Sequence, residues 1–106
     1  MELTIFWTEF SEKELDNIFN YFKEKVGVKF AKKLVNEIYS EALKTVSFPE
    51  IGQKEEFLKG IKGEFRYLIV KNYKLIYWVN KMNNEIIVID VFDTRQNPVK
   101  LQRGIK

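Results

Sequence analysis

Three stretches in the second half of the chain decide its fold: FRYLIV at residues 65–70, YKLIYWV at 73–79 and EIIVIDVF at 85–92. Each stretch is rich in β-branched and aromatic residues, and only short polar segments separate them. This pattern predicts an antiparallel meander of three strands. The polar and basic sequence DTRQNP follows at residues 93–98, and we expect it to lie beside the sheet as a mobile tail.

The first half of the chain predicts one short strand, at residues 3–7, and two helices. The sequence from Ser11 to Glu14 matches a capping box, so the first helix should begin there, and Gly27 should end it. The second helix should run from about Val28 to Val46. Apolar residues at helical spacing give the sides expected to be buried: Leu15, Ile18, Phe19 and Phe22 in the first helix, and Ala31, Leu34, Val35, Ile38, Ala42 and Val46 in the second.

Together these elements predict a single α+β domain over residues 1–106, in the order β-α-α-β-β-β. The helical hairpin should pack on one face of a mostly antiparallel sheet. The position of the first strand in that sheet stays open.

Composition excludes several kinds of chemistry. The chain has no histidine and no cysteine, so it lacks the usual base for neutral pH, a thiolate nucleophile and the common ligands of transition metals. We therefore expect no metal and no cofactor. No apolar run approaches the roughly 20 residues of a membrane span, and a basic leader is missing, so we expect a cytoplasmic protein that does not bind membranes.

Charge is divided unevenly along the chain. Residues 1–52 carry a net charge of −2 and residues 53–106 carry +5, which together give the overall +3. A basic sheet half suits an acidic partner or a nucleic acid, although a lysine-rich exterior is also common in soluble proteins. The remaining Lys, Arg, Asp, Glu and Tyr side chains could cleave RNA without a metal. They would act by general acid–base catalysis and by stabilising the pentacoordinate phosphorane that forms when the RNA 2′-hydroxyl attacks the phosphate.

The sequence resembles the RelE/ParE superfamily, the toxins of bacterial type II toxin–antitoxin modules, which include plasmid stabilisation systems. The resemblance rests on the order of elements, on FPEIG at residues 48–52, on YKLIY at 73–77 and on a last strand that leads into TRQNP at 94–98. It covers the chain from about Leu3 to Pro98. It implies a toxin that a cognate antitoxin neutralises. RelE-like members cleave messenger RNA on the ribosome, whereas ParE-like members poison DNA gyrase.

If the chain is a ribosome-dependent endoribonuclease, the resemblance implies Glu56, Arg66, Lys74 and Arg95 as its catalytic residues. Lys74 stands where such nucleases have an arginine. A lysine lacks the planar guanidinium that suits a phosphorane. Asp93 stands where relatives often have histidine, and no tyrosine or histidine follows Arg95. These departures favour a ParE-like action on DNA gyrase. RNA cleavage is the alternative, and a non-catalytic protein-binding module is the second alternative.

For the antitoxin we expect an acidic, amphipathic segment in the groove between the hairpin and the sheet, which would contact Arg66, Trp78, Arg95 and Gln96. Structural roles are open for the same residues. Arg66 could face solvent or pair with Asp90 or Asp93, Lys74 could be a solvated strand lysine, and Glu56 could be an exposed loop acid. Because neighbouring strand residues alternate between faces, at most one of Tyr77 and Trp78 should lie in the core.

Overall fold

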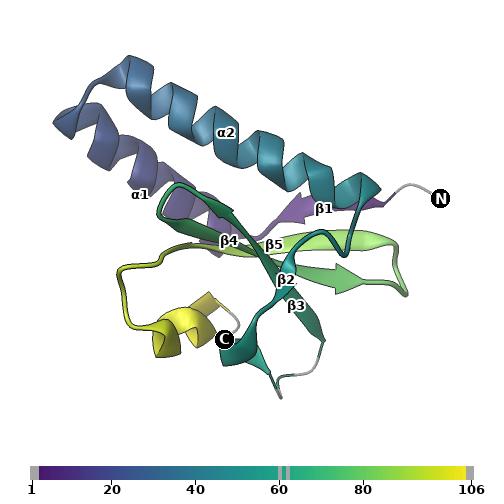
Figure 1. Cartoon of the computed structure of the whole chain (residues 1–106). Helices are drawn as coiled ribbons and strands as arrows, with labels where there is room; N and C mark the ends of the chain where they lie inside the picture. The colour runs from purple at the N-terminus through teal and green to yellow at the C-terminus, as the bar shows by residue number, and fades with distance from the viewer. Residues whose placement is uncertain (1–2, 60, 62, 105–106) are drawn as a thin grey trace.

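Five strands form one mixed sheet in the order β1-β5-β4-β3-β2 in the computed structural model, which describes residues 3–59, 61 and 63–104 (Figure 1). The strands are β1 (Thr4–Trp7), β2 (Gln53–Lys54), β3 (Glu64–Val70), β4 (Tyr73–Asn80) and β5 (Glu85–Asp93). The three last strands form the predicted antiparallel meander. β1 lies at one edge and runs parallel to β5, which settles the position of the first strand.

Two antiparallel helices, α1 (Glu9–Lys25) and α2 (Val28–Ser47), cover one face of this sheet (Figure 1). The predicted α+β fold with a helical hairpin on a mostly antiparallel sheet is confirmed. Gly27, with φ of 135°, lies between the two helices, as predicted. This backbone angle favours glycine because a Cβ atom would be strained there.

The predicted start of α1 is wrong by three residues. Thr8 is the N-cap, and its Oγ1 accepts a hydrogen bond of 3.0 Å from the backbone N–H of Ser11. The Ser11 hydroxyl is fully buried and donates to the Thr8 carbonyl at 2.8 Å. Thr8 takes the capping position because it follows β1 directly in an extended conformation, so the chain turns into the helix one residue after the strand.

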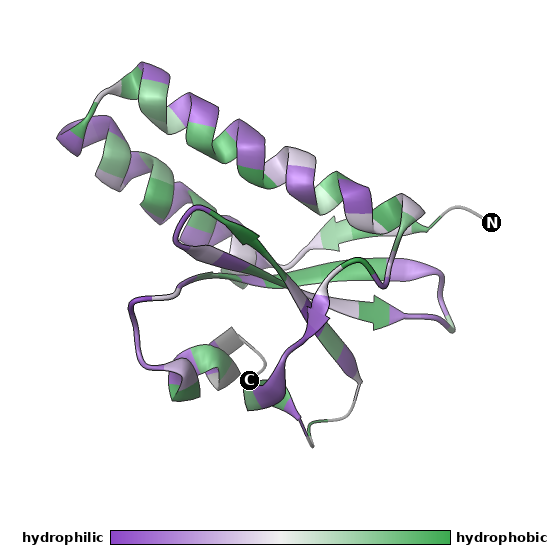
Figure 2. Ribbon diagram, viewed as in Figure 1, coloured by the Kyte–Doolittle hydropathy of each residue, from purple (hydrophilic) through white to green (hydrophobic). Residues whose placement is uncertain are grey.

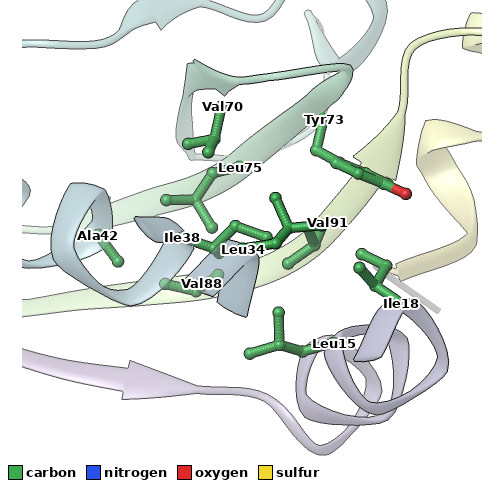
Figure 3. Close-up of a cluster of buried hydrophobic side chains, with 10 residues drawn as sticks. All are labelled: Leu15, Ile18, Leu34, Ile38, Ala42, Val70, Tyr73, Leu75, Val88 and Val91. Atoms are coloured by element: carbon green, nitrogen blue, oxygen red, sulfur yellow. The ribbon is translucent and has the colours of Figure 1, made fainter. Parts of the chain in front are cut away.

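The main core lies between the helical hairpin and the sheet. Figure 3 shows side chains of α1 and α2 pointing toward residues of β4 and β5. Its buried members are Leu15, Ile18, Leu34, Ile38, Ala42, Val70, Tyr73, Leu75, Val88 and Val91. The predicted buried sides of the helices are confirmed at Leu15, Ile18, Ala31, Leu34, Ile38 and Ala42, while Phe19, Phe22, Val35 and Val46 are half-buried.

The opposite face of the sheet is covered as well, which the sequence did not predict. Two 3₁₀ helices, η1 (Glu56–Leu58) and η2 (Pro98–Gly104), lie against it (Figure 1). They close a second core of Leu58, Phe65, Ile76, Ile89, Phe92 and Leu101. The segment expected to be a mobile tail is instead held at both ends, because the Thr94 N–H donates to the Asn72 carbonyl at 2.8 Å and Leu101 of the following η2 is only 1% exposed. The apolar second face of β4 and β5 requires such a cover.

Candidate functional site

The residues proposed from the sequence do not gather at one site. Arg66 lies opposite Tyr77 on the face of the sheet that carries the helices. Lys74 lies on the other face, because its side chain alternates with those of Tyr73 and Leu75 in the main core. Arg95 follows the end of β5, where Asp93 is the partner of Tyr73. Arg66 and Arg95 are therefore separated along β4 by about four residues, or roughly 13 Å.

Arg66 holds the loop that follows α2. Its Nη1 donates to the carbonyl of Gly52 at 2.7 Å and to the carbonyl of Glu50 at 3.4 Å, and its Nε donates to the carboxylate of Glu64 at 2.7 Å. The expected alternative of a pair with Asp90 or Asp93 is wrong. Hydrogen bonding to Arg66 lowers the pKa of the Glu64 carboxyl. The guanidinium is thus occupied by groups of its own chain, and its side chain is only 14% exposed.

Tyr77, on β4, also holds this loop through hydrogen bonds. Its hydroxyl donates to the Pro49 carbonyl at 2.7 Å and accepts from the Gly52 N–H at 2.9 Å. Burial raises the pKa of this phenol. A Cβ atom on Gly52 would come within 2.7 Å of both the Tyr67 carbonyl and the Tyr77 hydroxyl, so only glycine fits. The FPEIG sequence, one of the features that carried the resemblance, is therefore a tightly fixed loop.

This fixed loop exposes apolar side chains. Phe48 and Ile51 are 66% and 47% exposed. Together with Leu3, Pro49 and Val79 they line a mostly apolar groove of about 700 Å³, which Lys81 and Glu50 border. A loop that is rigid and yet exposes large apolar side chains is suited to contact with another protein.

Lys74 belongs to a second, separate cluster. Its ammonium pairs with Glu55 at 2.8 Å and lies 4.3 Å from the centre of the Tyr67 ring. Glu55 is almost fully buried and also accepts a hydrogen bond from the N–H of Phe57. Glu56, the acid proposed from the sequence, is exposed, and the ion pair of Lys74 is with Glu55 instead. The lysine is therefore neutralised by the neighbouring acid rather than by Glu56.

Trp78 is partly buried on the same face as Lys74. Its ring stacks on Phe65, with centroids 6.4 Å apart, and it packs against the second core. A Cβ atom on Gly63 would approach its indole nitrogen to 2.4 Å, so the tryptophan is covered closely there. Tyr77 is fully buried on the opposite face, which confirms that only one of the two adjacent rings lies fully in the core.

Arg95 and Gln96 border a shallow cleft of about 260 Å³ between α1, the end of β5 and η2, which also includes Tyr21 and Tyr73. The Arg95 guanidinium makes two hydrogen bonds to the carboxylate of Asp93, at 3.0 and 2.7 Å, and its side chain is 66% exposed. This pair lowers the pKa of Asp93 and raises that of Arg95. Of the proposed cations, Arg95 presents the most exposed side chain to a partner.

An ion pair that the sequence did not predict fixes the C-terminal 3₁₀ helix. Asp90 is fully buried, and its two oxygens accept from Arg103 at 3.1 Å each. Arg103 also pairs with Glu14 of α1 at 3.2 Å and lies over the rings of Phe10 and Phe92. No sequence signal links an acid in a hydrophobic strand to an arginine thirteen residues later.

This arrangement brings no nuclease-like set of residues together. Arg66, Lys74 and Arg95 lie in three clusters, each already paired with an acid. Within the described residues, no group of three or more Asp or Glu side chains could hold a metal ion. None of the described helices combines the length and the apolar character needed to cross a membrane. Of the features described so far, the apolar groove beside Phe48 and the cleft beside Arg95 are open to a partner.

The family "ParE toxin of type II toxin-antitoxin system, parDE" matches residues 5–98, which is most of the chain. The chain belongs to the ParE toxin family. A solved structure titled "Chromosomal ParDE TA system from P. aeruginosa" has a similar fold, with a TM-score of 0.71 and 18% sequence identity over 86% of this chain and 95% of that one. No curated protein matches the sequence.

The family match confirms the RelE/ParE resemblance and makes the chain the toxin component of a type II toxin–antitoxin system. The matched range ends at Pro98, where η2 begins. It therefore includes the fixed loop, Lys74 and Arg95, but only the first residue of η2. The roles of Glu56, Arg66, Lys74, Trp78, Arg95 and Gln96 stay predictions.

Proposed function

We propose that this ParE toxin arrests growth by acting on DNA gyrase, in the cytoplasm, and without a cofactor or metal. The observation that carries the proposal is the family match over residues 5–98, which is to ParE rather than to RelE. The departures at Lys74 and Asp93 from the RNA-cleaving pattern point the same way.

The scattered cations also support an action other than RNA cleavage. Phosphorane stabilisation needs cations that converge on one phosphate. Arg66 and Lys74 lie on opposite faces of the sheet and are engaged by carbonyls or by a buried carboxylate. Ribosome-dependent cleavage of messenger RNA, and a binding module without catalysis, are the outcomes that would replace the gyrase proposal.

The proposed partner in the cell is a cognate antitoxin with an acidic, amphipathic segment. The exposed positions support contact with Arg95 and Gln96 in their cleft, where Tyr21 adds an exposed ring. Arg66 is mostly covered, so we now assign it to holding the loop that presents Phe48 rather than to direct contact. An acidic segment would meet the basic half of the chain and exposed apolar side chains together.

Expression in bacteria tests the proposal. The chain alone should stop growth, co-expression with its antitoxin should restore growth, and chromosomal DNA should accumulate gyrase-bound breaks. Messenger RNA cut in phase with codons, lost in Arg66→Ala or Lys74→Ala, would instead establish RNA cleavage. Normal growth at verified levels of folded protein would exclude toxicity and leave the binding module.

Calorimetry tests the partner surface. Arg95→Glu should weaken antitoxin binding at least tenfold, because the change reverses an exposed charge and adds a second acid beside Asp93. Lys59→Glu, an equal charge change at an exposed position of another segment, is the matched control and should have little effect. Equal affinity of the Arg95 variant and the parent would place the antitoxin elsewhere.

A further inference from the structure

A lysine-rich groove lies between α2 and the turn that joins β3 to β4. Its volume is about 820 Å³. Five lysines and two glutamates contribute to its walls, with Asn36, Ser40, Ile69 and Val70 between them. The lysines are Lys29, Lys32, Lys33, Lys44 and Lys71, and the glutamates are Glu37 and Glu41. The groove belongs to none of the three clusters described above.

The charges in this groove do not balance. Glu41 pairs with Lys44 at 2.7 Å, and Glu37 lies 3.9 Å from Lys71. Within the part of the chain that the structure describes, no acid pairs with Lys29, Lys32 or Lys33. The groove therefore carries an excess of three positive charges. The net charge of −2 over residues 1–52 hides this excess, because the acids of α1 offset it in the sum.

The lysines form an elongated array. Lys29, Lys32 and Lys33 are spaced by three and four residues, so they share one side of α2. From Lys29 to Lys44 the helix rises about 22 Å. Lys71, at the tip of the β3–β4 turn, contributes the other wall. Figure 2 shows hydrophilic bands recurring along α2. Cations spread over this length of a helix can contact several phosphates along one nucleic acid backbone.

The kinds of residue in the groove favour nucleic acid over protein. The centres of protein–protein interfaces are enriched in aromatic residues and arginine and depleted in lysine. This groove has five lysines but no arginine and no aromatic ring. Interfaces with DNA are more polar and much more positive. Without rings for base stacking, the groove suits a duplex better than a single strand. Without arginine, it lacks the usual reader of guanine.

We propose that this groove binds the phosphate backbone of duplex DNA without sequence preference. Its lysines act as point charges that neutralise phosphates, and no base is read. The proposal concerns the isolated chain and does not depend on its action on gyrase. Failure of either proposal therefore leaves the other standing.

Fluorescence anisotropy with labelled duplexes of about 25 base pairs tests this binding. We expect dissociation constants of about 1–100 µM near physiological salt, equal for unrelated sequences. Contacts with about three to five phosphates predict a slope of about −2.7 to −4.5 for the logarithm of the association constant against the logarithm of salt concentration. A dissociation constant weaker than about 1 mM at 50 mM salt would overturn the proposal.

Two triple variants locate the site. Lys29→Glu, Lys32→Glu and Lys33→Glu together should weaken DNA binding at least tenfold and flatten the salt slope. The matched control changes Lys13, Lys59 and Lys100 to glutamate, three exposed positions on other segments with the same total charge. An equal loss in the control would show that net charge, and not this groove, attracts DNA. Thermal melting shows whether both variants remain folded.

A competition experiment separates DNA from an acidic protein. Unlabelled duplex should displace labelled duplex at concentrations far below those of poly-glutamate with the same number of charges. Displacement by both polymers at equal charge concentrations would show a surface for acidic polypeptides and would overturn the DNA proposal.

Discussion

Replacing Arg103 by methionine should loosen the C-terminal 3₁₀ helix and destabilise the whole fold. The change keeps much of the apolar side chain that lies over Phe10 and Phe92 but removes the guanidinium. Asp90, which is fully buried, then loses both of its hydrogen bonds to Arg103. Glu14 also loses its partner, although this loss matters less because Glu14 is partly exposed.

The size of the effect follows from the buried carboxylate. Removing one partner of a buried ion pair typically costs about 3–5 kcal/mol, because the remaining charge lacks compensation. Protonation of Asp90 limits this cost, so we expect a loss of about 3 kcal/mol at pH 7. In a domain of this size such a loss lowers the melting temperature by about 10–20 °C. Thermal and urea unfolding followed by circular dichroism measure both quantities.

A second variant separates the charge from the packing. Asp90→Asn combined with Arg103→Met should be more stable at pH 7 than Arg103→Met alone, because no ionised carboxylate remains buried. A melting temperature of Arg103→Met within about 3 °C of the parent would refute the reasoning. A double variant that is less stable than Arg103→Met would refute it as well.

The stability difference between these two variants should depend on pH. Burial raises the pKa of Asp90 even though Arg103 opposes the shift. Between its ordinary pKa and this raised value the folded state binds more protons than the unfolded state, so the contribution of Asp90 to stability falls as pH rises. Without Arg103 the pKa of Asp90 rises further, so the pH range over which Asp90 loses stability with rising pH extends to higher pH. The stability gap between Arg103→Met and the double variant should therefore narrow from pH 7 to pH 5. A constant gap would contradict this account.

Two further predictions concern the loop and the second cluster. Tyr77→Phe removes the hydroxyl that bonds Pro49 and Gly52, and it should lower the free energy of unfolding by about 1–3 kcal/mol in urea titrations. An unchanged midpoint would show that the loop holds without it. Lys74→Met leaves the buried carboxylate of Glu55 without its ion-pair partner and should lower the melting temperature. Glu56→Gln should not lower it, because Glu56 is exposed. Equal effects of the two changes would contradict the pairing.

Sequence patterns predicted the elements with strong periodicity. Residues 65–70, 73–79 and 85–92 form the meander, because apolar residues on both faces of β4 and β5 leave few alternatives to a central sheet. α2 was predicted almost to the residue, because its apolar side repeats over five turns. The N-cap of α1 was misplaced because Thr8 and Ser11 are both good caps, and only the end of β1 selects between them.

The site residues depended on contacts that sequence patterns do not encode. Glu55 and Glu56 are adjacent acids, and the start of η1 decides which one turns toward Lys74. A bulge at Ile89 shifts the register of β5, so Asp90 lies opposite Ile76 on the face that η2 covers. Short 3₁₀ helices lack a periodic apolar signal, so the second core could not be predicted.

The most direct test of the central claim is DNA cleavage by purified gyrase in the presence of the purified chain. After the reaction is stopped with detergent and protease, supercoiled plasmid should have become linear in proportion to the toxin added, and no linear product should form without gyrase. Addition of the antitoxin should abolish the effect. Plasmid that stays intact with active gyrase and folded toxin, together with messenger RNA cut on ribosomes by the same preparation, would contradict the account.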